Sequence, residues 1–377
     1  MSSHQRHIAP VYLSILLVCL PGILYLIGYP KSEPLSGAYT VPPKPKFQWE
    51  KWFSGDLQEQ IDDFLSLNLT LKPEAVRWAN QFHYSVLGRP NTRYVVKGKN
   101  EYLYEDAYIK AHYGMDFKGA QHWEEKGDRL EGIGDRLKEK GVELLVVLAP
   151  GKGSFYPEYI PDRYLTYKRE ETNFEALRTQ LDEHDIAYLD LKSWFEDMKE
   201  NSRARMFLFP KTGTHWSTYG MHLAADSILR YLDGALPGDQ PRWEIGLADL
   251  SEVLRDQDRD IEEGLNLKYP IENIPMPYPE FEIVDSAKQK IRTAVVADSY
   301  FWNMYNKGFC TQATDSSEFW YYAAQVYPQS FNGNYPLTAE HIKETLPKLD
   351  CIILLSTDGT LDRFPWSFDD LMEEALK

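Results

Sequence analysis

The sequence predicts an α/β fold in which helices cover both faces of a parallel sheet. Short apolar runs without polar alternation are typical of strands buried on both faces, and three occur at residues 142–149, 291–297 and 351–355. Amphipathic stretches with helical spacing alternate with these runs, at residues 123–140, 173–183 and 218–232. This alternation indicates a three-layer sandwich. A further strand is expected at 187–191, and a hairpin at 94–104, where two β-rich runs flank a Gly/Asn turn.

The composition excludes one class of function and leaves another open. The 377 residues carry a net charge of −16, and so acidic a chain lacks the positive patch that nucleic acids require. Aromatic residues make up 14%, and they serve either packing or stacking against sugar rings. The three cysteines form no CxxC or Cys/His cluster, so we expect no metal and no other cofactor. Cys310 and Cys351 form either a disulfide or two unpaired buried thiols.

The N-terminus predicts a membrane anchor at residues 1–29. Residues 8–29 contain no charge, and as a helix they would extend about 33 Å, enough to cross a bilayer core. Arg6 precedes this run, so we expect the short N-terminus to stay inside the cell and the bulk of the chain to be exported. The alternative is a cleaved signal peptide, which has a shorter apolar core and a small-x-small site that is not seen here. The expected location is the plasma (inner) membrane, single-pass, with the domain in the periplasm or extracytoplasmic space.

A proline-rich segment at residues 30–46 predicts an extended tether between the anchor and a domain at residues 47–377. Within that domain, residues 235–290 are rich in proline and acidic residues. We expect them to form an insertion or lid with little regular structure. In parallel sheets, function gathers at the carboxyl ends of the strands, which directs attention to the segments after residues 149 and 297.

Ser299 is the first candidate functional residue. It follows the apolar strand run that ends at Ala297, and a serine at such a strand end can be exposed as a nucleophile. It would need a histidine nearby as a base. The competing interpretation is that Ser299 caps the following helix.

His215 is the second candidate, in the polar segment Lys-Thr-Gly-Thr-His-Trp-Ser-Thr-Tyr-Gly at residues 211–220. A lone histidine is more often a hydrogen-bonded structural group than a catalytic one. Ser217 is the expected N-cap of the helix that follows.

Four segments together resemble the alginate O-acetyltransferase-like family of SGNH hydrolase-like proteins. The His-Trp block at 215–216 resembles that family's "Asp-x-His-Trp" block, and Ala-Asp-Ser-Tyr-Phe at 297–301 resembles its "Gly-Asp-Ser-Phe" block. The hairpin at 98–104 and the segment 148–157, which contains Lys152, resemble two further family motifs. The motifs occur in the family's order, with the histidine before the serine, whereas ordinary SGNH hydrolases carry the serine first.

The resemblance implies an SGNH-hydrolase-like, flavodoxin-like fold and acyl transfer to a polysaccharide. Ser299 would be acylated, His215 would be its base, and the Ser299 N–H would contribute to an oxyanion hole. Tyr305 and Lys152 match positions that imply substrate binding or oxyanion stabilisation. For Lys152, the match also fits a positioning role or a purely structural one. The acetyl group would pass to a hydroxyl of an exported polysaccharide, and a membrane-bound O-acyltransferase would be the donor partner.

One position departs from the family pattern. Gly213 stands where the family has the acid that orients the histidine. Either another carboxylate or a carbonyl replaces it, or activity is low, or the domain is a non-catalytic glycan-binding subunit of an export complex. A glycan esterase would use the same residues. Asp298 is not an obvious substitute, because a residue adjacent to the serine at a strand end points away from it.

Overall fold

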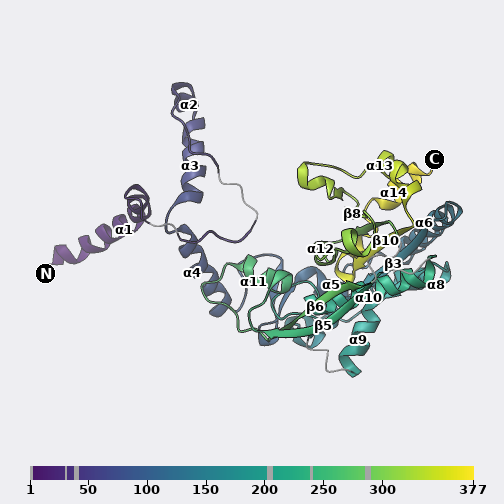
Figure 1. The fold of residues 1–377 in the computed structure, drawn as a ribbon. Helices are drawn as coiled ribbons and strands as arrows, with labels where there is room; N and C mark the ends of the chain where they lie inside the picture. Colours follow the sequence, from purple (N-terminus) through teal and green to yellow (C-terminus); the bar gives the residue numbers. More distant parts are fainter. Residues whose placement is uncertain (1–2, 30–31, 38–41, 202–206, 238–240, 285–289) are drawn as a thin grey trace. The chain divides into compact units, whose positions relative to one another are not determined.

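The structure is a computed structural model that describes residues 3–29, 32–37, 42–201, 207–237, 241–284 and 290–377. It divides into two compact units, residues 1–92 with 262–270, and residues 93–261 with 271–377. The first unit is helical, with the elements α1 (Ser3–Leu26), α2 (Trp49–Ser54), α3 (Asp56–Asn68) and α4 (Lys72–Ser85) (Figure 1). Its described part of residues 30–46 forms neither helix nor strand. Among the described residues, we find no helix with both the length and the apolarity of a membrane span.

The second unit is built on a six-stranded sheet in the order β4-β3-β10-β7-β8-β9. The strands are β3 (Glu143–Ala149), β4 (Tyr188–Asp190), β7 (Thr293–Ala297), β8 (Glu318–Tyr321), β9 (Gln325–Tyr327) and β10 (Cys351–Thr357). All neighbouring pairs are parallel except β8 and β9. The predicted parallel sheet is therefore confirmed. The sequence patterns did not indicate β8 or the antiparallel edge strand β9.

The strand order explains why the histidine precedes the serine along the chain. We leave out the antiparallel strand β9 and count the five parallel strands from β7 through β8 and β10, and then on to β3 and β4. The order across the sheet is then 2-1-3-4-5. That is the flavodoxin-like order, in which the first strand delivers residues to the topological switch point. The fold is thus a circular permutation of that topology, and the strand that carries Ser299 comes third along this chain.

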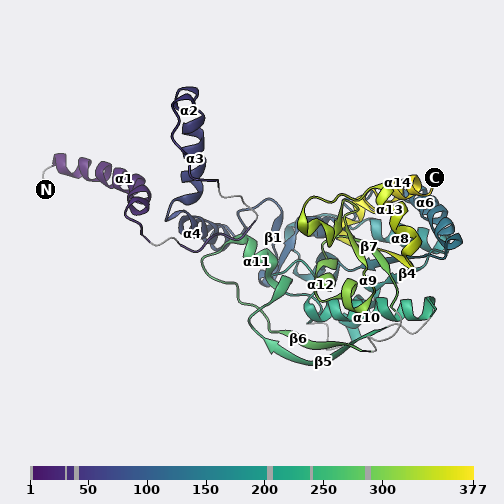
Figure 2. The same ribbon diagram turned by 45° about the horizontal axis from the view of Figure 1, so that its top comes forward.

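Helices cover both faces of the sheet, as predicted. The side chains of each strand alternate between two cores. Leu145 and Val147 face one core, and Leu144 and Val146 face the other. The first core is closed by α5 (Asp106–Tyr113), α9 (Leu191–Asn201), α10 (Thr218–Ala235) and α12 (Phe301–Asn306). The second is closed by α6 (Ala120–Glu139), α8 (Asn173–Glu183), α13 (Ala339–Thr345) and α14 (Phe368–Ala375) (Figure 2).

The hairpin prediction is confirmed, whereas the expectation for residues 235–290 is wrong in one respect. Strands β1 (Val95–Lys97) and β2 (Leu103–Glu105) form the predicted hairpin. The insertion contains an antiparallel ribbon of β5 (Arg242–Ser251) and β6 (Met276–Val284), together with α11 (Asp260–Leu265). The prolines of β6 obscured this strand, because a two-stranded ribbon tolerates proline where a central strand does not.

Candidate active site

Ser299 lies at the carboxyl end of β7, in the turn that leads into α12. The preceding residue, Asp298, fixes this turn. Its Oδ2 accepts hydrogen bonds from the backbone N–H and hydroxyl of Thr357 at 2.9 and 2.8 Å, and from the Thr360 hydroxyl at 2.7 Å. The Asp298 carboxylate is therefore held at the end of β10 by these hydrogen bonds. It points away from the histidine, as expected for a residue beside the serine.

The structure brings the two predicted residues together. Nε2 of His215 lies 2.9 Å from Oγ of Ser299, although 84 residues separate them in the chain. The interpretation of Ser299 as a helix cap does not hold, since Tyr300 occupies the N-cap position of α12 and makes no side-chain cap bond. A serine hydroxyl hydrogen-bonded to an imidazole nitrogen is the pairing that nucleophilic catalysis requires.

The loop that carries His215 is held at both sides. Ser217 caps α10, as predicted, by accepting a hydrogen bond from the Gly220 N–H at 3.0 Å. Tyr300, next to the serine, donates its hydroxyl to the carbonyl of Thr214 at 2.7 Å, and its buried ring packs 4.8 Å from the imidazole. The serine turn thus supports the histidine loop directly, which limits the motion of one relative to the other.

Asp260 supplies the acid that the sequence motif lacks. Its Oδ2 lies 2.5 Å from Nδ1 of His215, on the opposite side of the ring from Ser299. Its Oδ1 accepts from the backbone N–H groups of Thr214 and Ile261, each at 2.7 Å. Both carboxylate oxygens are therefore occupied. The imidazole is held in the tautomer with Nδ1 protonated, which leaves Nε2 free to accept the serine proton.

The absence of a side chain at Gly213 allows the segment that carries Asp260 to pack against the histidine loop. A Cβ atom at position 213 would lie 2.6 Å from the carbonyl oxygen of Gln257 and 2.8 Å from the backbone of Asp258. Backbone atoms cannot yield at that distance as the end of a flexible side chain can. The segment before α11 therefore packs where a side chain at 213 would stand. The loss of the motif acid makes room for the segment that delivers its replacement.

Asp260 gives little signal in the sequence. It is one of several acidic residues in an insertion, and no fixed spacing relates it to the histidine. It begins α11, immediately after the 3₁₀ turn Asp256–Arg259. Within that turn, Asp258 is buried and accepts a hydrogen bond from the Thr218 N–H at 3.3 Å, which ties the segment to the start of α10. Burial raises the pKa of Asp258 to about 7.

The electrostatic environment favours a charged histidine. Burial alone lowers the pKa of His215, but the charge and hydrogen bond of Asp260, with smaller contributions from Glu105 and Asp298, outweigh it and raise the pKa above its ordinary value. Burial also raises the pKa of Glu105. A raised histidine pKa indicates that the imidazolium formed during proton transfer is stabilised.

Lys152 does not point to the serine, because its amine is directed into the histidine loop. The side chain is buried, and Nζ donates to the carbonyl oxygens of Lys211 and Gly213, each at 2.7 Å. Burial lowers the pKa of Lys152 well below its ordinary value, although the charge of Asp260 opposes this. The contacts are those of a residue that fixes the backbone two residues before His215.

Tyr305 lies on α12 in a cluster of aromatic side chains. Its ring packs 5.6 Å from Trp302 and 5.7 Å from Phe319, and burial raises the pKa of its hydroxyl to about 12. The cluster extends from Trp302 to Tyr321 and Tyr327, and to Phe331, which is 61% exposed. The structure thus places a half-buried aromatic cluster around the helix that starts beside the nucleophile, with Phe331 as its exposed member.

Tyr322, which the sequence motifs did not indicate, also reaches the nucleophile. Burial raises the pKa of its hydroxyl, and the nearby Ser299 side chain opposes this rise. Tyr322 and Ala323 form the β8–β9 turn, and both have a φ of +51°. Two successive left-handed residues that are not glycine cost roughly 1–3 kcal/mol each, and such strain is found at functional sites.

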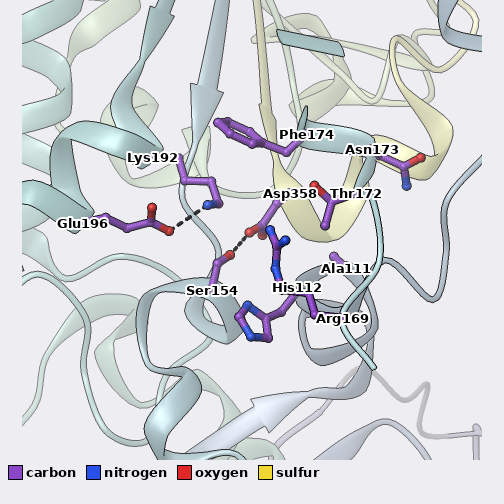
Figure 3. A pocket seen from close by; sticks show the side chains of 10 residues that line it. All are labelled: Ala111, His112, Ser154, Arg169, Thr172, Asn173, Phe174, Lys192, Glu196 and Asp358. Atoms are coloured by element: carbon purple, nitrogen blue, oxygen red, sulfur yellow. Dashed lines mark hydrogen bonds and ion pairs between the residues drawn. The ribbon is translucent and has the colours of Figure 1, made fainter. Parts of the chain in front are cut away.

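A separate cavity of about 230 Å³ lies beyond the ends of β3 and β10 (Figure 3). Burial lowers the pKa of His112 in its wall to about 4, with help from Arg169 and Lys192, and burial raises the pKa of Asp358 to about 7. The Ser154 hydroxyl donates to Asp358, as the figure shows. Ser299, His215 and Asp260 do not line this cavity.

Asp128, Glu131 and His184 are the described residues whose ligand atoms come close enough to hold a metal ion, within 4.8 Å of one another. They lie on α6 and at the end of α8, apart from the serine and histidine. Nδ1 of His184 is hydrogen-bonded with Glu131 at 3.0 Å.

Of the two alternatives for Cys310 and Cys351, the structure has unpaired buried thiols, and burial raises the pKa of both.

Comparisons with known proteins give the same family as the motifs. Residues 95–247 match the family model described as "SGNH hydrolase-like domain, acetyltransferase AlgX". This match contains Lys152 and His215 and ends before Asp260 and Ser299. The probable alginate O-acetylase AlgJ of Pseudomonas syringae pv. tomato is 27% identical over 141 residues, 37% of this chain and 33% of that protein. The AlgJ of Pseudomonas putida is 26% identical over 141 residues, 37% of this chain and 34% of that protein.

The matched segment thus spans about a third of the length of these two relatives. Among solved structures, the O-acetyltransferase domain of Pseudomonas putida AlgJ aligns with a TM-score of 0.49 and 18% identity, over 74% of this chain and 99% of that domain. The predicted resemblance is confirmed: residues 95–247 of this chain are similar to the SGNH hydrolase-like domain of the alginate O-acetyltransferase-like family.

Proposed function

We propose that the protein is an O-acetyltransferase that moves an acetyl group, through an acylated Ser299, to a hydroxyl of an extracytoplasmic polysaccharide. The observation that carries the proposal is the continuous hydrogen-bonded series Ser299–His215–Asp260, with distances of 2.9 and 2.5 Å. A serine, an imidazole and a half-buried carboxylate, hydrogen-bonded in this order, can transfer an acyl group without a cofactor.

The first half of the reaction acylates the enzyme. Oγ of Ser299 attacks the carbonyl carbon of the acetyl donor, and its proton passes to Nε2 of His215. Asp260 stabilises the resulting imidazolium through Nδ1. In this proposal the Ser299 N–H and the Tyr322 hydroxyl stabilise the oxyanion. The intermediate then expels the donor's leaving group, which takes the proton from His215.

The second half regenerates the serine. A sugar hydroxyl takes the place of the leaving group and gives its proton to Nε2 of His215. Its oxygen then attacks the acetyl ester on Ser299, and the serine recovers the proton as the ester bond to the enzyme breaks. The half-buried rings of Trp302 and Tyr305 and the exposed ring of Phe331 support a sugar acceptor, because pyranose faces stack on such rings. Hydrolysis would differ only in that water replaces the sugar.

The cellular setting belongs to the proposal as well. The uncharged residues 8–29 support a single anchor in the plasma (inner) membrane, with the catalytic unit in the periplasm or extracytoplasmic space. A membrane-bound O-acyltransferase is the donor partner that the family resemblance implies. The non-catalytic alternative loses its main support, because Asp260 fills the role of the acid that is absent at Gly213.

The test measures acetylation of the surface polysaccharide in cells that carry the Ser299→Ala variant of the full chain. We expect the acetyl content to fall to that of cells without the protein, and unchanged acetylation would contradict the proposal. Purified full-length protein, offered an activated acetyl ester with and without oligosaccharide, then separates the two reactions. Acetylated sugar indicates transfer, whereas free acetate alone indicates an esterase.

A further inference from the structure

The helical unit exposes a cluster of four aromatic side chains, Phe47, Trp49, Trp52 and Phe53, which we call the aromatic turn. Their exposed fractions are 58, 68, 45 and 80%. The rings contact one another, with centroids 4.9 Å apart for Phe47 and Trp49 and 6.0 Å apart for Trp49 and Phe53. Helix α2, which carries three of them, contains no buried residue. The cluster is therefore ordered against itself and is not part of a core.

The aromatic rings of α2 share one side of the helix. Trp49, Trp52 and Phe53 are spaced i, i+3 and i+4, so they project from the same face, and Glu50 and Lys51 lie on the other. The Gln58 side chain donates to the carbonyl of Trp52 at 3.0 Å and ties the turn to α3. So much exposed aromatic surface in one place marks an interaction site.

The chemistry of the aromatic turn fits the interface of a lipid bilayer. Tryptophan is enriched at membrane–water interfaces, where its ring lies among the headgroups and its N–H remains hydrated. Lys44, Lys46 and Lys51 stand in and around the turn with one acid, Glu50, whereas the next helix, α3, is acidic. Lysines beside aromatic rings can pair with anionic headgroups while the rings lie among them.

The position in the chain favours the same partner. Residues 30–46 separate the turn from the end of the uncharged run at Tyr29, and even fully extended they reach about 60 Å at most. With residues 8–29 anchored in the bilayer, as proposed above, the turn cannot leave the neighbourhood of the membrane surface. We propose that the aromatic turn inserts into the headgroup region of the bilayer and forms a second, interfacial contact of the protein with the membrane.

The inference is tested on the full chain in vesicles of phosphatidylcholine and phosphatidylglycerol. An environment-sensitive fluorophore is attached at Ser54→Cys, which keeps all four aromatic rings, in a Cys19→Ser background. Cys310 and Cys351 are fully buried and stay unlabelled. The matched control carries the label at Leu247→Cys in β5, where the native side chain is 89% exposed. Quenching by lipids brominated near the headgroup is then compared at the two positions.

We expect the Ser54 label to be quenched at least about threefold more strongly than the Leu247 label, since interfacial helices bury their apolar face roughly 5–10 Å into the headgroup boundary. A second protein with Trp49→Ser and Phe53→Ser and the same label should lose this difference and keep its acetyl-ester turnover. Equal quenching at the two positions overturns the inference. A second result also overturns the inference: the label at position 54 is protected from quenching by iodide in the water but is not quenched by the brominated lipid. That result would indicate that a protein partner covers the aromatic turn.

Discussion

Nδ1 of His215 and Oδ2 of Asp260 lie 2.5 Å apart, although the histidine precedes α10 and the aspartate starts α11 in the insertion. The acid of the candidate triad therefore comes from a different segment than the family motif indicates. Asp260 is also held by the Thr214 N–H, so the carboxylate contacts both the ring and the backbone next to it. The position of Asp260 beside His215 therefore depends on both the insertion and the backbone of the histidine loop.

Gly213→Ala is expected to separate the acid from the histidine. The added methyl group would lie 2.6 Å from the Gln257 carbonyl oxygen, so the segment before Asp260 must move. Overpacking of this kind costs about 1–3 kcal/mol. A misplacement near 1 Å can lower turnover about 100-fold.

The measurement is the turnover of an activated acetyl ester together with the melting temperature. Gly134→Ala serves as control, because its new Cβ would meet no atom nearer than 3.6 Å. If Gly213→Ala turns over as fast as Gly134→Ala, then Gly213 does not make room for the segment that carries Asp260.

The pH dependence follows from the raised pKa of His215. The base must be neutral to accept the serine proton, so kcat/KM should rise with pH and reach its plateau only above the raised pKa. Because the Asp260 charge outweighs the effect of burial, the acid limb should lie above pH 6.5, the ordinary value. Removal of that charge in Asp260→Asn should move the limb to lower pH. A pH–rate profile with its limb at or below pH 6.5 in the native protein would disagree with this assignment.

Lys152→Met should weaken both stability and activity. The substitution leaves the buried carbonyl of Gly213 without a donor, and an unpaired buried group of this kind costs about 1–3 kcal/mol. The Lys211 carbonyl loses one of two donors and keeps the Leu103 N–H. The loop that carries His215 loses its support at the same time. Thermal unfolding and ester turnover are compared with Lys99→Met, whose side chain is 41% exposed and pairs with Asp162. Equal melting temperatures for the two variants would show that the two hydrogen bonds of Lys152 are unimportant.

Tyr322→Phe removes a hydroxyl beside the nucleophile and leaves the turn unchanged. If this hydroxyl stabilises the oxyanion, turnover should fall about 100-fold or more while KM and the melting temperature change little. Tyr335→Phe, in which the native side chain is 42% exposed, is the matched control. Turnover close to that of this control would limit Tyr322 to a packing role.

The sequence predicted the parts of the fold that rest on local pattern. The apolar run at 142–149 became β3, and the amphipathic stretch at 218–232 became α10 with Ser217 as its cap. Strands β8 and β9 were missed because they have only four and three residues, too few to show a period. The ribbon β5–β6 was missed because β6 contains two prolines and β5 is mostly exposed. Ser299 and His215 were identified through motifs. Asp260 was not, because only the tertiary path of the insertion brings it to the histidine.

The Asp260→Asn variant tests the central claim most directly. The measured quantity is the rate at which an activated acetyl ester acylates Ser299, followed by the mass of the intact chain. Asparagine keeps the shape but holds the imidazole in the wrong tautomer, so the rate should fall about 10⁴-fold. Asp256→Asn, in the same segment and paired with Lys307, should keep the native rate. Acylation of Asp260→Asn within about tenfold of the native rate would contradict the role of Asp260 as the acid of the triad.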